Sequence, residues 1–267
     1  MRILVTGAAT GIGRATAVEL TKRGHEVVAG ARRVERLDDL DVAARVTLDV
    51  TDEKSVATAV GEAGDLDGVV NNAGVSEPGP IEDYPIDVLR RVLDTNVVGP
   101  VMVSQAVIAP MRERGGGVIV NVGSVQGRIG IPFGGAYCAS KHALEGFSEV
   151  LRYEVGHFGI RVVLIEPGYI ASGPAYDPGR ERVSHGDHLA VYDELRRQWD
   201  GADDQVAGAV RPGPEVVAAA IADAFDDPAT PFRVRVGADA DMVLSVRSTM
   251  DDETFEATMR QVLNLTW

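Results

Sequence analysis

Short hydrophobic runs alternate along the chain with longer segments in which hydrophobic residues recur every three or four positions. The short runs are rich in valine and isoleucine and predict strands buried on both faces, whereas the longer segments predict amphipathic helices. The predicted strands are residues 2–6, 26–30, 45–48, 69–70, 118–122, 161–166 and 232–236. The predicted helices are residues 13–23, 53–62, 86–114, 137–158 and 216–225. This alternation predicts a three-layer α/β sandwich, in which a seven-stranded, mostly parallel sheet carries helices on both faces.

Two regions depart from the alternation. Residues 169–214 are rich in Gly, Pro, Asp and Arg, with one helix expected near residues 189–199. Long irregular segments of this kind commonly serve as lids or binding loops. Residues 238–267 predict a tail of two helical pieces. Because no repeat or linker marks a second domain, we expect a single domain over residues 1–267, with a substrate-loop insertion at about 169–214 and a helical tail at about 238–267.

The composition of the chain restricts the classes of molecule it is expected to bind and the compartment in which it is expected to work. The chain has 267 residues, 45% of them hydrophobic, a formal net charge of −14 and one cysteine. The negative charge argues against nucleic acid or an anionic membrane as partners, so a phosphate-bearing ligand must be attracted by local features. A lone cysteine excludes an intrachain disulfide and fits a reducing compartment. With no signal-peptide pattern and no apolar run near the ~18 residues that span a bilayer, we expect a cytoplasmic protein.

A glycine-rich turn follows the first predicted strand. It reads Gly7-Ala8-Ala9-Thr10-Gly11-Ile12-Gly13 and leads directly into a helix. Glycines let the backbone approach a pyrophosphate, and a helix N-terminus supplies N–H donors and a positive dipole. An ordinary tight turn is the alternative. Because the turn opens a β-α-β series, the context favours a phosphate cradle in a Rossmann-type fold.

The end of the second strand bears on cofactor choice. Enzymes that use NAD usually carry an acid there, which holds the ribose 2′-hydroxyl. This chain has Ala31-Arg32-Arg33 instead. A guanidinium pairs well with a 2′-phosphate, so NADP(H) is favoured over NAD(H). The alternatives are that both arginines are solvated or that Arg32 stacks on adenine.

Further polar or glycine-containing stretches also fall just beyond predicted strands. Asp49 follows the third strand and can accept a hydrogen bond from an adenine amino group. Asn71-Asn72-Ala73-Gly74, Ser124 and Pro167-Gly168 follow later strands. In an open parallel sheet the carboxyl ends of the strands form the ligand-binding edge. The sequence therefore gathers its candidate site residues at one edge.

The stretch around Tyr137 carries the candidate chemistry. Tyr137 and Lys141 lie four residues apart, on one face of a predicted helix. A phenol has a pKa near ~10, which a neighbouring ammonium is expected to lower. Ser124 at a strand end can donate a hydrogen bond to the same reacting oxygen. Surface helices often carry such Tyr/Lys pairs by chance. Because Lys22, Lys54 and Lys141 are the only lysines in the chain, the scarcity of lysine argues against an interchangeable surface cation at this position.

In these motifs the chain resembles the short-chain dehydrogenase/reductase family, in its compact single-domain branch. The resemblance runs from Arg2 to about Val236. The matching motifs, in order, are Thr6-Gly7-x-x-x-Gly11-Ile12-Gly13, Asn71-Asn72-Ala73-Gly74, Asn96, Ser124, Tyr137-x-x-x-Lys141 and Pro167-Gly168. Residues 137–154 and the Ala31-Arg32 pair are most similar to the NADP-preferring hydroxysteroid and retinol dehydrogenase group.

The resemblance implies an NADP(H)-dependent oxidoreductase that interconverts a ketone or aldehyde and an alcohol by hydride transfer, with Tyr137 as general acid/base. It implies that Ser124 polarises the substrate oxygen and that Lys141 binds the nicotinamide ribose and lowers the tyrosine pKa. Asn96 would hold a water in a proton relay to Lys141. Ser172, where relatives usually have threonine, would contact the nicotinamide carboxamide.

The resemblance also implies the wider ligand-binding set. The cofactor contacts would be Thr6, Gly7, Thr10, Gly11, Ile12, Gly13, Arg32, Arg33, Asp49, Val50, Asn72, Ala73, Gly74, Tyr137, Lys141, Pro167, Gly168, Ile170 and Ser172. A substrate pocket can be lined by Val125, Phe133, Tyr169 and Tyr176, although aromatic loop residues as often pack internally. Relatives associate through the helices at 86–114 and 137–158, so we expect a homodimer or homotetramer.

Other functions remain open. A catalytically silent NADP(H)-binding regulatory or scaffold protein would have the same fold, but the intact Asn96, Ser124, Tyr137 and Lys141 set argues against it. Epimerases and dehydratases use the same tyrosine and lysine, yet those relatives usually have a longer substrate domain. His185-Gly186-Asp187-His188 lacks further ligands at known spacing, so no metal site is expected.

Overall fold

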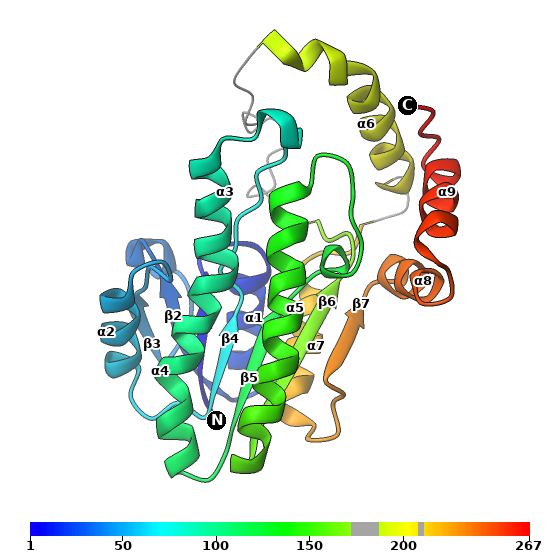
Figure 1. The fold of residues 1–267 in the computed structure, drawn as a ribbon. Coiled ribbons are helices and arrows are strands. Elements are labelled where there is room, and N and C mark those ends of the chain that lie inside the picture. The colour runs from blue at the N-terminus through cyan, green and yellow to red at the C-terminus, as the bar shows by residue number, and fades with distance from the viewer. Residues whose placement is uncertain (172–186, 208–210) are drawn as a thin grey trace.

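The seven strands form one parallel sheet at the centre of the molecule (Figure 1). The structure is a computed structural model that describes residues 1–171, 187–207 and 211–267, with side chains 187–189 and 203–207 outside that description. The strands are β1 (Arg2–Thr6), β2 (Glu26–Ala31), β3 (Ala44–Thr47), β4 (Gly68–Asn71), β5 (Gly117–Val122), β6 (Ile160–Pro167) and β7 (Arg233–Val236). Their order is β3-β2-β1-β4-β5-β6-β7, and each described pair is parallel. The predicted sheet is confirmed, with strand ends within one or two residues of expectation.

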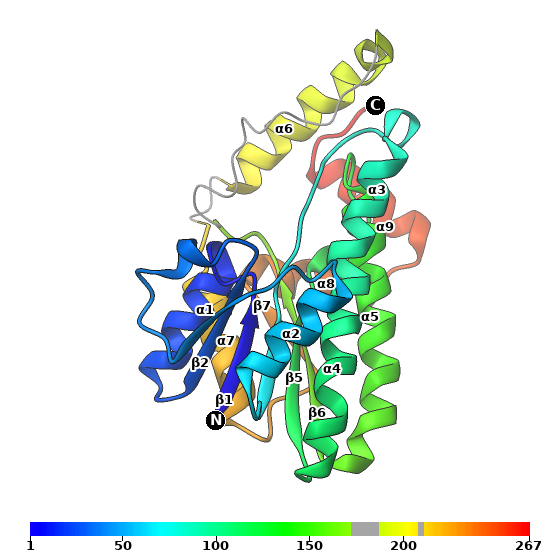
Figure 2. The same ribbon diagram turned by 90° about the vertical axis from the view of Figure 1, so that its left-hand side faces the viewer.

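Helices cover both faces of the sheet (Figures 1 and 2). They are α1 (Gly11–Lys22), α2 (Glu53–Ala63), α3 (Ile86–Leu93), α4 (Gly99–Glu113), α5 (Gly135–Val155), α6 (Asp193–Ala207), α7 (Glu215–Asp226), α8 (Ala238–Arg247) and α9 (Asp252–Val262). Helices α1 and α7 pack together on one face, where Leu20 and Ile221 join the buried cluster. Helices α2, α4 and α5 cover the other face, with Val56, Val107 and Leu151 in its core.

The long helix predicted at 86–114 contains an irregular turn. Residues Asp94–Val98 between α3 and α4 are π-helical, and Pro100 stands at the start of α4. Proline has no N–H to donate to the carbonyl of Asn96, four residues earlier, which accounts for the locally widened turn. The regular hydrogen-bond ladder of the helix is therefore interrupted next to Asn96.

By length and composition this helix can cross a membrane. Residues Ile86–Glu113 form 28 helical residues, and an 18-residue window of them has a mean hydropathy of 1.4. The expectation concerned unbroken apolar runs, none of which approaches ~18 residues, whereas this helix qualifies by the mean hydropathy of a window that includes polar residues. A core helix passes the same test, and Val103, Val107 and Met111 are at most 2% exposed against the sheet.

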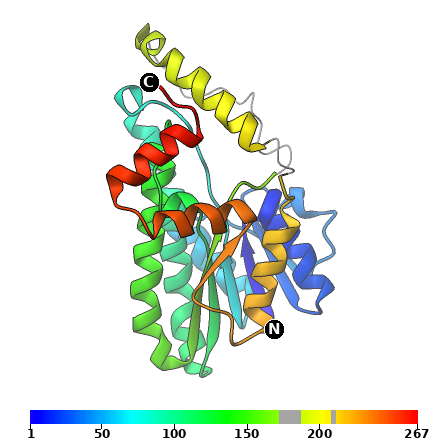
Figure 3. The same cartoon turned by 90° about the vertical axis from the view of Figure 1, so that its right-hand side faces the viewer.

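The C-terminal tail packs on the helix of the substrate segment (Figure 3). Leu263 and Leu265, just beyond α9, are buried against Leu195 and Trp199 of α6. Gln198 on α6 also hydrogen bonds with Thr266 through both its amide nitrogen (2.9 Å) and its amide oxygen (2.7 Å). The two helical pieces predicted for the tail are confirmed, and so is one helix in the substrate segment.

Candidate active site

The glycine-rich turn lies against the turn that follows β4. Gly7 has a φ of +65°, and a Cβ there would stand 2.9 Å from Ala73 Cα. A Cβ on Gly13 would lie 2.4 Å from both Asn72 Nδ2 and Gly7 O. Real Cβ contacts are not this short, so both positions require glycine. The predicted Gly7–Gly13 turn and Asn72–Gly74 turn are thus brought together at the sheet edge.

The Thr6 hydroxyl joins these two turns. It is 1% exposed, donates to Val70 O over 3.2 Å, and accepts from the backbone N–H groups of Asn72 and Ala73, each at 3.0 Å. Asn72 Nδ2 in turn donates to Thr6 O over 3.0 Å. Thr6 therefore fixes the end of β1 to the loop after β4. Its predicted contact with a cofactor stays a prediction, since this hydroxyl is already fully bonded.

The N-terminus of α1 suits an anion. Thr10 is its N-cap residue, in an extended conformation, and within the described residues its side chain makes no cap hydrogen bond. The first N–H groups of a helix lack intrahelical partners and carry the positive end of the dipole. Gly11 and Ile12 begin the helix here and are only partly buried. The turn is therefore able to hold a phosphate with main-chain donors.

The second and third strands end in the groups expected for the adenosine side. Arg32 and Arg33 are exposed, and within the described ranges neither guanidinium group forms a hydrogen bond or an ion pair with another residue. Both guanidinium groups are thus available to a ligand. Asp49 is half-buried and its Oδ1 accepts from the N–H (3.0 Å) and the hydroxyl (2.7 Å) of Thr51, while Val50 beside it is 6% exposed.

Ser124, Tyr137 and Lys141 converge beside the end of β5. Ser124 lies two residues beyond β5, where its Oγ accepts from Gln126 N over 3.1 Å, and it is close enough to the Tyr137 phenol to act on its pKa. Lys141 is 6% exposed, donates from Nζ to Val122 O over 2.7 Å, and lies 5.4 Å from the Tyr137 ring centroid. The four-residue spacing on α5 thus places both side chains on one face, as predicted.

The expected direction of the tyrosine pKa is wrong for the chain alone. Burial raises the pKa of Tyr137 to about 12, and the hydrogen bond from Ser124 opposes this only in part. Burial also lowers the pKa of Lys141 to about 8, with Glu145 acting in the opposite direction. Desolvation disfavours the charged forms of both side chains and is the largest cause of each shift. At neutral pH the phenol therefore keeps its proton.

Asn96 ties the catalytic helix to the loop after β4. Its Nδ2 donates to Val75 O (2.9 Å) and Ser140 Oγ (3.0 Å), while its Oδ1 accepts from Val75 N (2.8 Å). Ser140 Oγ then donates to Tyr137 O over 2.7 Å. The side-chain amide of Asn96 is therefore occupied, and a relay water of the kind the sequence suggests would have to use its main chain.

Three of the four predicted pocket residues lie in the described part of the chain. Val125 is half-buried after Ser124, and Phe133 adopts a φ of +61°, a strained conformation for a side chain of this size. Tyr169 is half-buried, with its N–H donating to Asp239 Oδ2 over 2.6 Å. Ser172, Tyr176 and His185 lie outside the described residues, as does the side chain of His188.

Two residues that contact Phe133 and Tyr169 were not predicted from the sequence. Arg196 of α6 stacks over the Phe133 ring at 4.8 Å. It lies in the irregular segment, where no periodicity singles out one arginine. Asp239 in the first turn of α8 holds the chain at Gly168, where a Cβ would stand 2.2 Å from its carboxylate. The close Gly237 and the acidic first turn were its only sequence signals. Pro167 ends β6 there, and Ile170 packs against the core.

Comparison with known proteins decides the family. The family model described as short chain dehydrogenase matches residues 1–178 of the 267. The chain belongs to the short-chain dehydrogenase family. A crystal structure of a short-chain dehydrogenase from Streptomyces avermitilis is 34% identical, with a TM-score of 0.79 and 97% of each chain covered.

Curated relatives match about three-fifths of this chain. The uncharacterized oxidoreductase YusZ of Bacillus subtilis (strain 168) is 43% identical over 178 residues, which is 62% of this chain and 63% of that protein. Retinol dehydrogenase 5 of Homo sapiens is 41% identical over 180 residues, covering 62% of this chain and 56% of that one. The chain thus spans about three-fifths of the length of the curated relatives it matches.

Proposed function

We propose that this short-chain dehydrogenase is an NADP(H)-dependent oxidoreductase that interconverts a ketone or aldehyde and the corresponding alcohol. The observation that carries the proposal is the meeting of Ser124, Tyr137 and Lys141 beside the glycine-rich turn, at the carboxyl edge of the sheet. A nicotinamide cofactor supplies the hydride when bound. Everything else the reaction needs is a proton and an oriented substrate oxygen.

Tyr137 is the proton donor in the reductive direction. Its pKa of about 12 keeps the phenol protonated at neutral pH, so it can deliver a proton to the oxygen that gains charge as hydride arrives at carbon. Ser124 stands at the same place and can hydrogen bond to that oxygen. Lys141, held at Val122 O and close to the tyrosine ring, stabilises negative charge on the phenol after the proton has left.

NADP(H) is favoured by the end of β2. Arg32 and Arg33 are exposed at the sheet edge where the adenosine ribose of a dinucleotide lies in Rossmann-type folds. A guanidinium can form paired hydrogen bonds with a 2′-phosphate. Since the chain carries a net charge of −14, these two arginines supply local attraction that the overall field does not.

The substrate is a largely apolar carbonyl or alcohol. Val125, Phe133 and Tyr169, the predicted pocket residues that the structure describes, are half-buried and would offer the substrate aliphatic and aromatic groups. The name of retinol dehydrogenase 5 refers to an apolar alcohol, which agrees with this chemistry. Since this chain matches only 56% of that relative, the argument extends to the substrate class and not to retinol.

The protein self-associates through α5 and the neighbouring helix α4. The outer face of α5 exposes Val150 (55%) and Tyr153 (85%), and Val98 just before α4 is 44% exposed. Clustered exposed apolar side chains on packed helices are typical of subunit interfaces. A homodimer in the cytoplasm is the expected state, with a homotetramer as the alternative.

Oxidation of NADPH and of NADH by a panel of aliphatic and aromatic ketones and aldehydes tests the proposal. We expect turnover with NADPH, and Arg32→Asp should weaken NADPH binding about tenfold or more while changing NADH binding little. Equal losses for both cofactors would contradict the role of Arg32. Tight NADPH binding without turnover on any carbonyl would instead support a catalytically silent cofactor-binding protein.

A further inference from the structure

Two buried carboxylates, Glu145 and Glu166, share an arginine partner one helical turn beyond Lys141. Glu145 follows Lys141 by one turn of α5 and is 6% exposed. Glu166 comes from β6 and is 1% exposed. Buried carboxylates are normally fully hydrogen-bonded or paired, because an unpaired buried charge is costly. Each of these two carboxylates is therefore expected to have hydrogen-bond or ion-pair partners for both of its oxygens.

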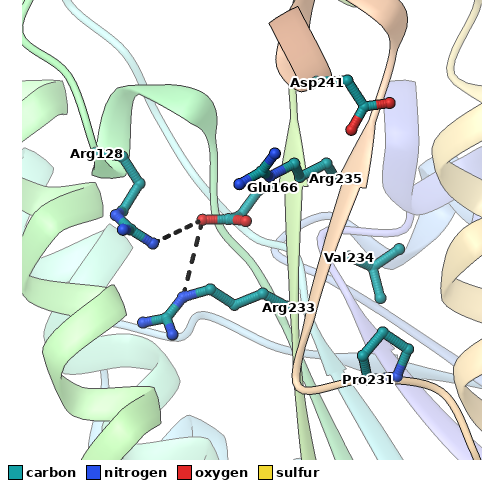
Figure 4. Close-up of a pocket in the computed structure, with 7 residues that line it drawn as sticks. All are labelled: Arg128, Glu166, Pro231, Arg233, Val234, Arg235 and Asp241. Atoms are coloured by element: carbon teal, nitrogen blue, oxygen red, sulfur yellow. Dashed lines mark ion pairs between the residues drawn. The ribbon is translucent and has the colours of Figure 1, made fainter. Parts of the chain in front are cut away.

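Arginine side chains reach both carboxylates but leave one buried oxygen of each without a hydrogen bond. Figure 4 shows the ion pairs of Glu166 with Arg128 and Arg233. Arg233 Nε is 3.0 Å from Glu145 Oε2 but 3.9 Å from Glu166 Oε1, and Arg128 Nη1 is 3.6 Å from the same Glu166 oxygen. Oε1 of Glu145 and Oε1 of Glu166 are both buried and accept no hydrogen bond from the described residues. Arg233 also forms an ion pair with Glu149, in which its Nη2 lies 3.0 Å from Glu149 Oε1.

The group opens into a cavity of about 460 Å³ lined by Arg128, Glu166, Pro231, Arg233, Val234, Arg235 and Asp241. Within the described residues, none of the four predicted catalytic side chains lines this cavity, so it is separate from the candidate active site. The charged groups around Glu145 are Lys141 and Glu149 on α5, Glu166 on β6, Arg233 on β7 and Arg128 after β5. The cavity gives solvent protons a route to Glu166, which lines it, and from there to the Arg233 that Glu166 shares with Glu145.

We propose that Glu145 and Glu166 together hold one proton near neutral pH, carried mainly by Glu145, and that its release sets the charge of Lys141. Glu145 and Glu166 approach the same Arg233 Nε, and each keeps one buried oxygen without a hydrogen bond, so simultaneous ionisation of both carboxyls is disfavoured. Glu145 acts on the reaction through Lys141 and is a positioning residue. The link to turnover rests on the proposed function, whereas the proton on the pair does not.

The charge balance points the same way. Burial, and then the neighbouring Glu166, raise the pKa of Glu145 to about 7, while Arg233 opposes them. Once the proton leaves, the Glu145 carboxylate stabilises the Lys141 ammonium, whose pKa burial has lowered to about 8. The pair thus gains negative charge in the pH range where Lys141 would otherwise lose its proton.

The lysine count makes a direct test practical. With lysine labelled with ¹³C at Cε, the protein gives signals from Lys22, Lys54 and Lys141 only. Lys22 and Lys54 are exposed and act as internal controls. Glu149→Gln is the matched variant, because Glu149 contacts the same Arg233 at the same 3.0 Å but is 55% exposed.

We expect the Lys141 titration midpoint to fall by about half a pH unit or more in Glu145→Gln. It should stay unchanged in Glu149→Gln. A Glu145→Gln midpoint equal to wild type, or an equal shift in Glu149→Gln, would overturn the proposal. Neither result depends on turnover, so failure of the proposed function would be seen separately.

Titration of ¹³Cδ-labelled glutamate completes the test and covers the case in which Glu145→Gln does not fold. One carboxyl should titrate above about pH 6 in wild type, and its midpoint should fall in Glu166→Gln because a like charge has been removed. All carboxyls titrating below about pH 5 in wild type would contradict the shared proton. In activity, Glu145→Gln should match wild-type kcat/KM at pH 6 and fall several-fold below it at pH 9.

Discussion

Substitution of Thr6 by valine isolates one buried hydroxyl that joins the two ligand-side turns. Valine has the shape of threonine, so the change removes hydrogen bonds and leaves packing nearly intact. The hydroxyl of Thr6 bonds to Val70 O at 3.2 Å and to the N–H groups of Asn72 and Ala73 at 3.0 Å each. Leaving a buried N–H without its acceptor costs about 1–3 kcal/mol. Because Asn72 and Ala73 are only partly buried, we expect a total loss of about 2–4 kcal/mol.

Thr16→Val is the matched control. Thr16 is 0% exposed, and its Oγ1 has no hydrogen-bond partner within the described residues. Removing an unbonded buried hydroxyl should leave the free energy of unfolding unchanged or raise it slightly. The two variants therefore differ in hydrogen bonding, although both replace a buried threonine by valine.

Thermal unfolding followed by circular dichroism, together with NADPH titration by fluorescence, measures both effects. The Tm of Thr6→Val should fall by about 5–10 °C, and its affinity for NADPH should weaken because the turns on both sides of the cofactor lose their link. Thr16→Val should keep wild-type values in both assays. Equal Tm values for the two variants would refute the assignment of Thr6 as the residue that joins the turns.

Three further predictions concern other parts of the fold. In the wild type, the Glu145 carboxyl has a pKa of about 7 in the folded state and 4.5 in the unfolded state, so its protonated form stabilises the fold at low pH and this contribution is lost as pH rises towards 7. Glutamine does not titrate, so the free energy of unfolding of Glu145→Gln should rise relative to wild type over the same range. Urea unfolding at pH 5 and pH 8 should show the gap growing by about 1–3 kcal/mol, and a pH-independent gap would contradict it. Gly13→Ala should weaken NADPH binding at least about tenfold by calorimetry, because its Cβ would displace Asn72 and Gly7; unchanged affinity would refute the close approach. Tyr153→Glu should lower the mass measured by light scattering to that of a monomer, and an unchanged oligomer would place the interface elsewhere.

Much of the fold follows from the sequence because its strands are buried on both faces. Runs such as residues 118–122 contain almost no polar positions, so their limits are visible within a residue or two. Glycines 7, 11 and 13 mark the first turn for a steric reason that the structure then shows at Gly13. The helical spacing likewise places Tyr137 and Lys141 on one face.

What the sequence could not supply is depth of burial and contact between distant segments. The spacing of Tyr137 and Lys141 shows that they are neighbours but not that desolvation is the largest cause of their pKa shifts, so the direction of the tyrosine pKa was wrong. Glu145 and Glu166 lie on a helix and a strand that meet only in the fold. The same holds for Trp199 and Leu263, whose contact joins the substrate segment to the tail.

The most direct test of the account is a single-turnover measurement of NADPH oxidation with a reactive ketone, comparing wild type with Tyr137→Phe. The phenylalanine ring keeps the packing but has no proton to donate, so the chemical step should slow by about 10²–10⁴-fold. NADPH affinity should remain within about threefold of wild type, a change of less than 1 kcal/mol. A Tyr137→Phe variant that oxidises NADPH at the wild-type rate would contradict the assignment of Tyr137 as the proton donor.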